Sequence, residues 1–189
     1  MNLNAAPELA QTISPWLMTI AAELGIPDTL PAARGLRVYQ EASHLVVAER
    51  GRDGRDYLLD GAAAQAWRML KAAAERDGIS VVIVSAFRSI ERQAEIIRAR
   101  LVAGANIADV LTSLAPPGFS EHHSGRAVDI STPGVGTVAT EFADTLAFAW
   151  LVAHAGEYRY SLSYPVDNAQ GYQYEPWHWC YHDAGSVID

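Results

Sequence analysis

The sequence predicts an α+β fold in which helices pack against an antiparallel sheet. Short runs rich in β-branched and aromatic residues are separated by helical blocks, without a regular strand–helix–strand repeat. Two of the runs are joined by an Asp-Gly turn, which is typical of a hairpin. The chain has 189 residues, of which 50% are hydrophobic and 19% charged, so we expect a single domain over 1–189 with a sizeable core.

The first 40 residues are expected to form an N-terminal helical segment. Residues 1–25 have an apolar pattern that predicts an amphipathic helix with Trp16, Leu17 and Ile20 turned inward. The runs LRVYQ (36–40) and HLVVAER (44–50) have the composition of strands. RDGRD supplies the turn that joins HLVVAER to YLLD, so a hairpin is expected here.

Two longer helices are expected in the middle of the chain, on either side of a buried strand. The first runs from the N-cap Asp60 to Gly78, and the second from Ser89 to Gly104. Between them, ISVVIVSAF is a continuous apolar run typical of a buried strand. One stripe of the second helix is apolar and is formed by Ile90, Ala94, Ile97 and Leu101.

The remaining elements are expected to alternate between helix and strand. They are a short helix (108–114), a strand (126–130), a third long helix (140–156) and two aromatic strands (158–165 and 172–181).

Composition excludes some classes of function. The net charge of −8 argues against a nucleic-acid partner, because phosphate binding needs a concentrated basic face. No run is long enough to span a membrane. The first 25 residues contain no Lys or Arg, unlike a secretory signal, so the sequence leaves the site of action open. Cys180 is the single cysteine, which excludes a disulfide within the chain.

Two stretches carry candidate chemistry, SEHHSGRAVDI (120–130) and YEPWHWCYH (174–182). An imidazole of the first stretch and the carboxylate of Asp129 are donors that zinc accepts, and His178 is the best candidate for a third ligand. Glu175 is placed three residues before His178, where a carboxylate could take a proton from water. Positions three apart on a regular strand face opposite sides, but Pro176 interrupts the strand, so convergence stays open.

These stretches match ordered family motifs. SEHHSGRAVDI fits SxHxxGxAxD, EPWHW fits ExWH, and the upstream SAFRSIERQ is similar to SGYRSxxxQ. The three blocks resemble the VanY-type D-alanyl-D-alanine carboxypeptidases, a branch of the LAS zinc peptidases of bacterial cell-wall metabolism. The resemblance runs from about Ser85 to the C-terminus, within an expected peptidase core of about 79–189. Ala86 and Phe87 depart from the usual Gly and Tyr.

The resemblance implies the hedgehog-like zinc peptidase fold and one zinc ion. The implied zinc ligands are His122, Asp129 and His178, and Glu175 is the implied catalytic base. Arg88 has a guanidinium that can bind a free C-terminal carboxylate bidentately. The resemblance adds Ser120 and Gln93 as groups that line the substrate site. His123 falls on a variable position, close to the ligands or exposed.

The expected activity is zinc-dependent removal of a C-terminal D-alanine from peptidoglycan stem peptides. The alternatives are an L,D-carboxypeptidase, a D,D-dipeptidase or endopeptidase acting on muropeptides, and a zinc-containing cell-wall binding module without turnover. Glu175 argues against the last alternative, because a pure binding module does not need a base. A serine hydrolase using Ser120 or Ser124 is disfavoured because the chain lacks a GxSxG elbow. The oligomeric state is left open.

Overall fold

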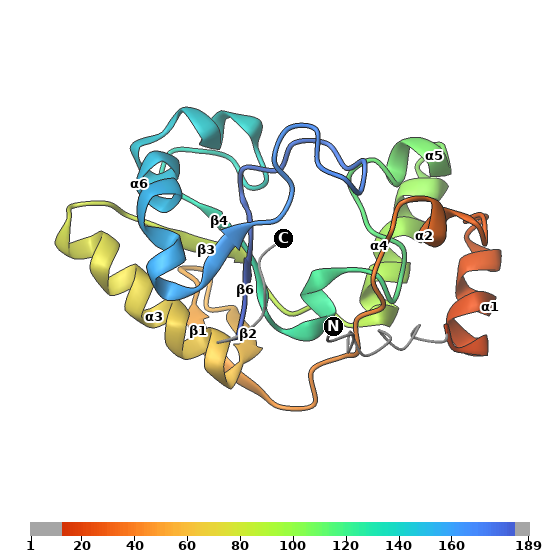
Figure 1. Ribbon diagram of the computed structural model, residues 1–189, viewed down its shortest axis with the longest axis horizontal. Coiled ribbons are helices and arrows are strands. Elements are labelled where there is room, and N and C mark those ends of the chain that lie inside the picture. The colour runs from red at the N-terminus through yellow and green to blue at the C-terminus, as the bar shows by residue number, and fades with distance from the viewer. Residues whose placement is uncertain (1–12, 184–189) are drawn as a thin grey trace, which may run out of the picture.

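The computed structural model describes residues 13–183 and consists of helices around two antiparallel sheets (Figure 1). The helices of the first half are α1 (Pro15–Glu23), α2 (Leu30–Ala33), α3 (Gly61–Arg76), α4 (Ile90–Val102) and α5 (Ile107–Val110). The second half contains α6 (Leu146–His154) and the 3-10 helices η1 (Glu121–Ser124), η2 (Thr140–Asp144) and η3 (Ala155–Tyr158). The strands are β1 (Leu45–Arg50), β2 (Asp56–Asp60), β3 (Val82–Ser85), β4 (Ala127–Ser131), β5 (Tyr160–Leu162) and β6 (His178–Tyr181).

The central sheet has four strands in the order β3-β4-β6-β5, and every neighbouring pair is antiparallel. Strands β1 and β2 form a separate hairpin. The predicted α+β class with helices against an antiparallel sheet is therefore confirmed. Within the described part of the chain, no helix combines the length and apolar character that crossing a bilayer requires.

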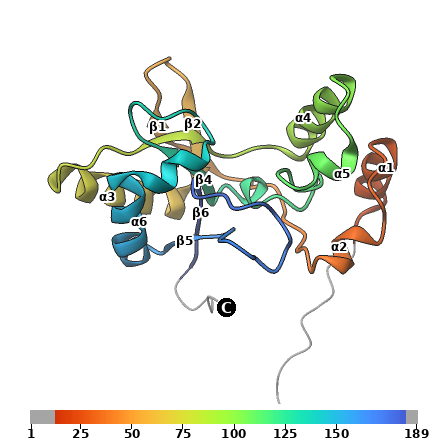
Figure 2. The ribbon, with the colours of Figure 1, turned by 90° about the horizontal axis from the view of Figure 1, so that it is seen from above.

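Buried side chains form two clusters. The larger cluster joins α3, α6 and the sheet, and the fully buried Trp67 lies in it. The smaller one joins α1, α4 and α5. Figures 1 and 2 show α3 and α6 at one end of the molecule and α1, α2, α4 and α5 at the other. The three predicted metal ligands lie between these two groups of helices, on η1, β4 and β6.

The two central helices and the hairpin form as predicted. Asp60 caps α3 by accepting a hydrogen bond from the Ala62 backbone N–H, and Ser89 caps α4 in the same way through the Arg92 backbone N–H. Gly78 follows the end of α3 with a positive φ angle. The sequence signals for capping therefore identified both helix ends to within one or two residues.

Two predictions about the N-terminal segment were wrong. Leu17 and Ile20 are buried, but Trp16 is 52% exposed, because the nine-residue α1 buries only one narrow face. Residues 36–40 form no strand. The Tyr39 N–H donates to the Gly118 carbonyl of a loop rather than to a neighbouring strand. The part of the predicted helix that falls on residues 1–12 lies outside the described residues.

The predicted third helix is broken into three pieces, η2, α6 and η3. Thr145 adopts extended backbone angles, and its hydroxyl accepts a hydrogen bond from the Phe148 N–H, so it starts a new helix. The aromatic strands are also shorter than predicted, since β6 begins only at His178. The residues before it, Glu175 to Trp177, form a turn closed by a hydrogen bond from the His178 N–H to the Glu175 carbonyl.

Gly125 is a position where the site depends on glycine. It ends η1 with a φ of +67°, and a Cβ there would lie 2.9 Å from the Asp60 backbone nitrogen and 3.0 Å from Leu45 Cδ2. Its carbonyl accepts a hydrogen bond from that same Asp60 N–H at 2.8 Å. This close approach ties the loop between His122 and Asp129 to the start of α3.

We expect Gly125→Ala to lower the free energy of unfolding by about 2–5 kcal/mol. A left-handed conformation costs an L-residue roughly 1–2 kcal/mol, and overpacking adds about 1–3 kcal/mol. Gly25→Ala is the matched control, because Gly25 has a φ of +70° but no atom within 4 Å of the Cβ position. Urea denaturation of both variants measures the difference, and equal losses would contradict the proposed close contact.

Candidate metal centre

The register of the central sheet brings two predicted ligands together. Asp129 on β4 is paired directly with His178 on β6, and on its other side Asp129 is paired with Ser85 on β3. Directly paired residues on antiparallel strands have Cβ atoms about 4.5–5.5 Å apart and point to the same face. The third predicted ligand, His122, comes from η1, which precedes β4.

His122, Asp129 and His178 converge as predicted. The Asp129 Oδ1 atom lies 3.4 Å from His122 Nε2 and 3.1 Å from His178 Nδ1. The two imidazole rings meet edge to face, with centroids 4.9 Å apart. Each residue offers one ligand atom within 4.8 Å of the others, and all three are buried. The group could therefore hold a metal ion.

Hydrogen bonds fix which nitrogen of each imidazole is available. The Nδ1 atom of His122 lies 2.7 Å from the Ala86 carbonyl, which can only accept, so Nδ1 carries the hydrogen and Nε2 is free. The Nε2 atom of His178 lies 2.8 Å from a carboxylate oxygen of Glu121, so Nε2 donates there and Nδ1 faces Asp129.

His123 has no free nitrogen. Its Nδ1 donates to the Arg88 carbonyl at 2.6 Å, and its Nε2 accepts from the Gly118 N–H at 3.1 Å. The side chain is fully buried, and burial lowers the pKa of His123 to about 4. Of the two adjacent histidines, His122 is therefore the one that can bind a metal, and His123 supports the loops around it.

The turn before β6 brings Glu175 to the same place. Its carboxylate Oε2 lies 4.0 Å from His178 Nδ1, although the two residues are only three positions apart. Burial raises the pKa of Glu175 to about 7, and the negative charge of Asp129 acts in the same direction. A carboxyl with a pKa in this range can accept and release a proton near neutral pH.

Arg88 is held rigidly at the edge of the centre. Its guanidinium donates to Gln93 Oε1 at 2.9 Å and to Ser85 Oγ at 3.1 Å, and it lies 4.0 Å from Asp129 Oδ2. The Gln93 amide in turn donates to the Ala115 carbonyl at 2.6 Å. Burial lowers the pKa of Arg88 from its usual value, but the neighbouring carboxylates of Asp129 and Glu175 oppose that shift.

All seven predicted site residues border one cavity of about 400 Å³. The metal-ligating trio, Glu175, Arg88, Gln93 and Ser120 line it together with aromatic side chains that include Tyr164, Tyr172 and Trp177. The Tyr172 hydroxyl is buried and has no hydrogen-bond partner among the described residues. Trp179 does not border the cavity and packs in the larger core cluster.

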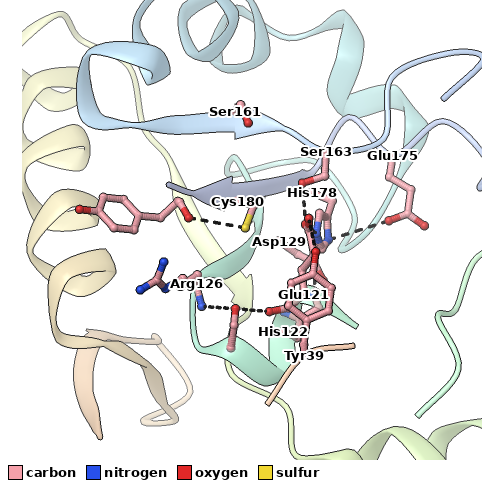
Figure 3. A network of polar contacts seen from close by, with 12 residues as sticks. Tyr39, Glu121, His122, Arg126, Asp129, Ser161, Ser163, Glu175, His178 and Cys180 are labelled. Atoms are coloured by element: carbon pink, nitrogen blue, oxygen red, sulfur yellow. Dashed lines mark hydrogen bonds and ion pairs between the residues drawn. The ribbon is translucent and has the colours of Figure 1, made fainter. Parts of the chain in front are cut away.

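Sequence reasoning missed Glu121. Figure 3 shows its carboxylate beside His178, with Tyr39 and Ser163 reaching the same carboxylate from other parts of the chain. Its place next to His122 in the motif gives no sign of this role, although metal-binding histidines usually donate their second N–H to an acceptor. That rule predicts a partner but does not say which residue supplies it.

The charges around His178 are strongly coupled. Burial lowers the pKa of His178, but hydrogen bonds to Asp129 and Glu121 outweigh burial and raise the pKa to about 10. Burial raises the pKa of Glu121, but its hydrogen bonds with His178 and Ser163 bring the pKa to about 2. His178 therefore lies between two carboxylates that favour a positive charge there, and a metal cation bound at Nδ1 would take the place of its proton.

The donor set fits zinc. Two imidazole nitrogens and one carboxylate oxygen are ligands that zinc accepts, and a catalytic zinc site uses three protein ligands and leaves a further position open. The second hydrogen bonds of His122 and His178 match the orientation that metal-binding imidazoles need.

Comparison with known sequences places this site in a family context. A family model described as VanY, D-alanyl-D-alanine carboxypeptidase, matches residues 56–184. The chain is 32% identical over 119 residues to a D-alanyl-D-alanine carboxypeptidase of Enterococcus faecalis, an alignment that covers 58% of this chain. The alignment covers 42% of the length of that relative. An alignment with the carboxypeptidase YodJ of Bacillus subtilis covers 43% of its length, so the chain spans less than half of either relative.

Solved structures give the same picture. The LdcB LD-carboxypeptidase aligns with a TM-score of 0.67 at 29% identity, covering 75% of this chain and 69% of that one. A mutant of the D,D-pentapeptidase VanY from a VanB-type resistance cassette, solved with Zn(II), aligns with a TM-score of 0.58 at 28% identity, covering 75% and 80%. VanYB in complex with D-alanine-D-alanine aligns with the same score and identity, covering 76% and 78%.

We expect the purified protein to bind one zinc ion and His178→Ala to weaken zinc binding by more than about 100-fold. Removing an outer partner of a metal ligand already costs about 10- to 100-fold, so removing a ligand should cost more. Competition with a chromophoric chelator measures the affinity. His154→Ala, at an exposed histidine at the end of α6, is the control. Unchanged affinity in His178→Ala would eliminate this site.

Proposed function

The chain belongs to the VanY D-alanyl-D-alanine carboxypeptidase family, and we propose that it is a zinc-dependent carboxypeptidase that removes a terminal D-alanine from peptidoglycan stem peptides. One observation carries the proposal. A trio of zinc-type donors, a buried carboxylate and a fixed guanidinium line a single cavity in this chain. The family structures solved with Zn(II) and with D-alanine-D-alanine support this choice of metal and substrate.

His122, Asp129 and His178 would hold the zinc ion. When bound, zinc acts as a Lewis acid that polarises a carbonyl group and lowers the pKa of water. The protein's own contribution is to orient the two imidazoles through their bonds to the Ala86 carbonyl and Glu121. The buried setting strengthens these electrostatic interactions, because little water is present to screen them.

Arg88 would bind the free C-terminal carboxylate of the substrate. Its guanidinium is directed by Gln93 and Ser85, and it borders the cavity close to Asp129. A planar guanidinium can bind a carboxylate with two parallel hydrogen bonds, which fixes the orientation of the terminal residue. Gln93 would thus act mainly by directing Arg88, while Ser120, which also borders the cavity, would bind the peptide backbone.

Glu175 would act as the general base and then as the general acid. Its carboxylate takes one proton from the attacking water while the oxygen of that water bonds to the scissile carbonyl carbon. The same proton passes to the amine of the departing D-alanine when the C–N bond breaks. The distance of 4.0 Å between Glu175 Oε2 and His178 Nδ1 supports this role.

A second candidate function is L,D-carboxypeptidase activity on tetrapeptide stems. The alignment with the LdcB LD-carboxypeptidase favours it, because its TM-score of 0.67 exceeds the 0.58 of the VanY structure. Mass spectrometry of defined stems separates the two, since a D,D-enzyme shortens pentapeptides and an L,D-enzyme shortens tetrapeptides. Hydrolysis of free D-alanyl-D-alanine to two D-alanines would instead indicate D,D-dipeptidase activity. If neither stem is cleaved by the zinc-loaded protein, the proposed activity is wrong.

We expect Glu175→Gln to lower kcat by roughly 10²- to 10⁴-fold while zinc stays bound, because only proton transfer is lost. Metal analysis and steady-state kinetics on the cleaved stem measure the two quantities. Glu75→Gln, an exposed position on α3, is the control. Near-normal turnover in Glu175→Gln would show that another group takes the proton.

Arg88→Ala is expected to reduce kcat/KM for a peptide with a free C-terminus by about 10- to 100-fold, the usual effect of losing a hydrogen bond to a charged group. On a peptide with an amidated C-terminus, the wild type and the variant should be similarly slow, because no carboxylate is present to bind. An equal loss on both peptides would mean that Arg88 supports the site instead of recognising the chain end.

A further inference from the structure

We propose that Glu121 is a positioning residue that fixes the orientation and tautomer of His178, and that it ties residues 34–42 of the N-terminal segment to the metal centre. This inference rests on the proposed zinc centre and assigns a role to a residue outside the predicted ligand, base and substrate-binding groups. Glu121 does not border the cavity of the proposed substrate site, so its influence on catalysis passes through His178.

Three donors from distant parts of the chain converge on the Glu121 carboxylate. Oε2 accepts from His178 Nε2 at 2.8 Å and from Ser163 Oγ at 2.6 Å, and Oε1 accepts from the Tyr39 hydroxyl at 3.3 Å. The carboxylate is mostly buried, with 14% of the side chain exposed. A carboxylate held by several donors has one defined position, and so does the imidazole that it binds.

The bond to Glu121 determines which nitrogen of His178 is left for metal. A carboxylate can only accept, so the Nε2 atom must carry a hydrogen that it donates to Glu121. Nδ1, which lies beside Asp129, is then the nitrogen that would give up its proton and bind the metal. Without this acceptor, the other tautomer or a rotated ring would place an N–H where the metal ligand belongs. Glu121 thus excludes the unproductive arrangement, as outer carboxylates do for metal-bound histidines.

Tyr39 makes the N-terminal segment part of this network. The segment precedes the region matched by the family model, which begins at residue 56. It is pinned by backbone bonds from Tyr39 to Gly118 and from Ala42 to the His123 carbonyl, at 2.8 Å each. Glu41 accepts a hydrogen bond from the first N–H of α4, close to Arg88. Through Tyr39, residues 34–42 would therefore help to hold Glu121, and with it His178, in place.

The test measures zinc affinity and a spectrum as well as turnover. Glu121→Ala removes the acceptor and is expected to weaken zinc binding by about 10- to 100-fold. Glu121→Gln keeps an oxygen that can accept from Nε2 and should recover most of the affinity. Tyr39→Phe and Ser163→Ala should each give part of the loss. Cobalt-substituted protein should show an altered visible spectrum in Glu121→Ala, because the geometry around the metal changes, while the substrate KM of the metal-saturated protein stays close to that of the wild type.

Glu141→Ala and Glu141→Gln are the matched controls, because Glu141 is an exposed acidic residue on the 3-10 helix η2. Circular dichroism and thermal melting verify that each variant is folded, and Glu121→Gln keeps the side-chain volume in case Glu121→Ala is unstable. Wild-type zinc affinity and cobalt spectrum in both Glu121 variants would overturn the inference while leaving the proposed function intact. Failure of the wild type itself to bind zinc or to cleave either stem would instead overturn the proposed function.

Discussion

The pairing of β4 with β6 is the constraint on which the site depends. It sets Asp129 opposite His178, and the flanking pairs, Val128 with Trp179 and Ala127 with Cys180, are buried as well. A shift of one residue in this register would turn every side chain of β6 to the opposite face, so apolar packing along the whole strand fixes the position of one ligand. The relative position of the two ligands is thus set by the packing of the hydrophobic core.

Backbone carbonyls orient the two adjacent histidines of the motif. The strand-to-helix corner after β3 supplies two acceptors, since the Ala86 carbonyl receives His122 and the Arg88 carbonyl receives His123. Each bond occupies the Nδ1 atom of its imidazole, and the Gly118 N–H also occupies Nε2 of His123, so of the two histidines only His122 keeps a nitrogen for metal. Buried polar groups are costly unless they are paired, and these pairs also direct the ligands. The same hydrogen bonds therefore stabilise the buried loops and orient the imidazole that would bind the metal.

The resemblance implied His122, Asp129 and His178 as a group, and the fold brings these three side chains together. The N-caps of α3 and α4, Asp60 and Ser89, could be predicted because each side chain binds a backbone N–H only two or three residues away. Spacing alone could not separate His122 from His123, because the deciding contact, from the Gly118 N–H to His123 Nε2, depends on how the preceding loop folds.

Other features were out of reach of local patterns for the same reason. Glu121 gains its role only from strands and loops that meet in three dimensions. Thr145 breaks the predicted third helix by using its hydroxyl as a cap, an option that an apolar periodicity does not reveal. Trp16 was placed inward by hydrophobicity alone, but α1 has too little contact surface to bury it.

The corner after β3 has one more consequence. Arg88 is two residues after Ala86, whose carbonyl binds the His122 side chain. The Arg88 N–H also donates a hydrogen bond to the His122 carbonyl at 3.2 Å, which joins the two stretches of backbone directly. In the proposed carboxypeptidase, the anchor for the chain end and the cutting position are therefore separated by a rigid interval. In such an enzyme, this fixed separation would set how many residues are removed from the end of the peptide in one step.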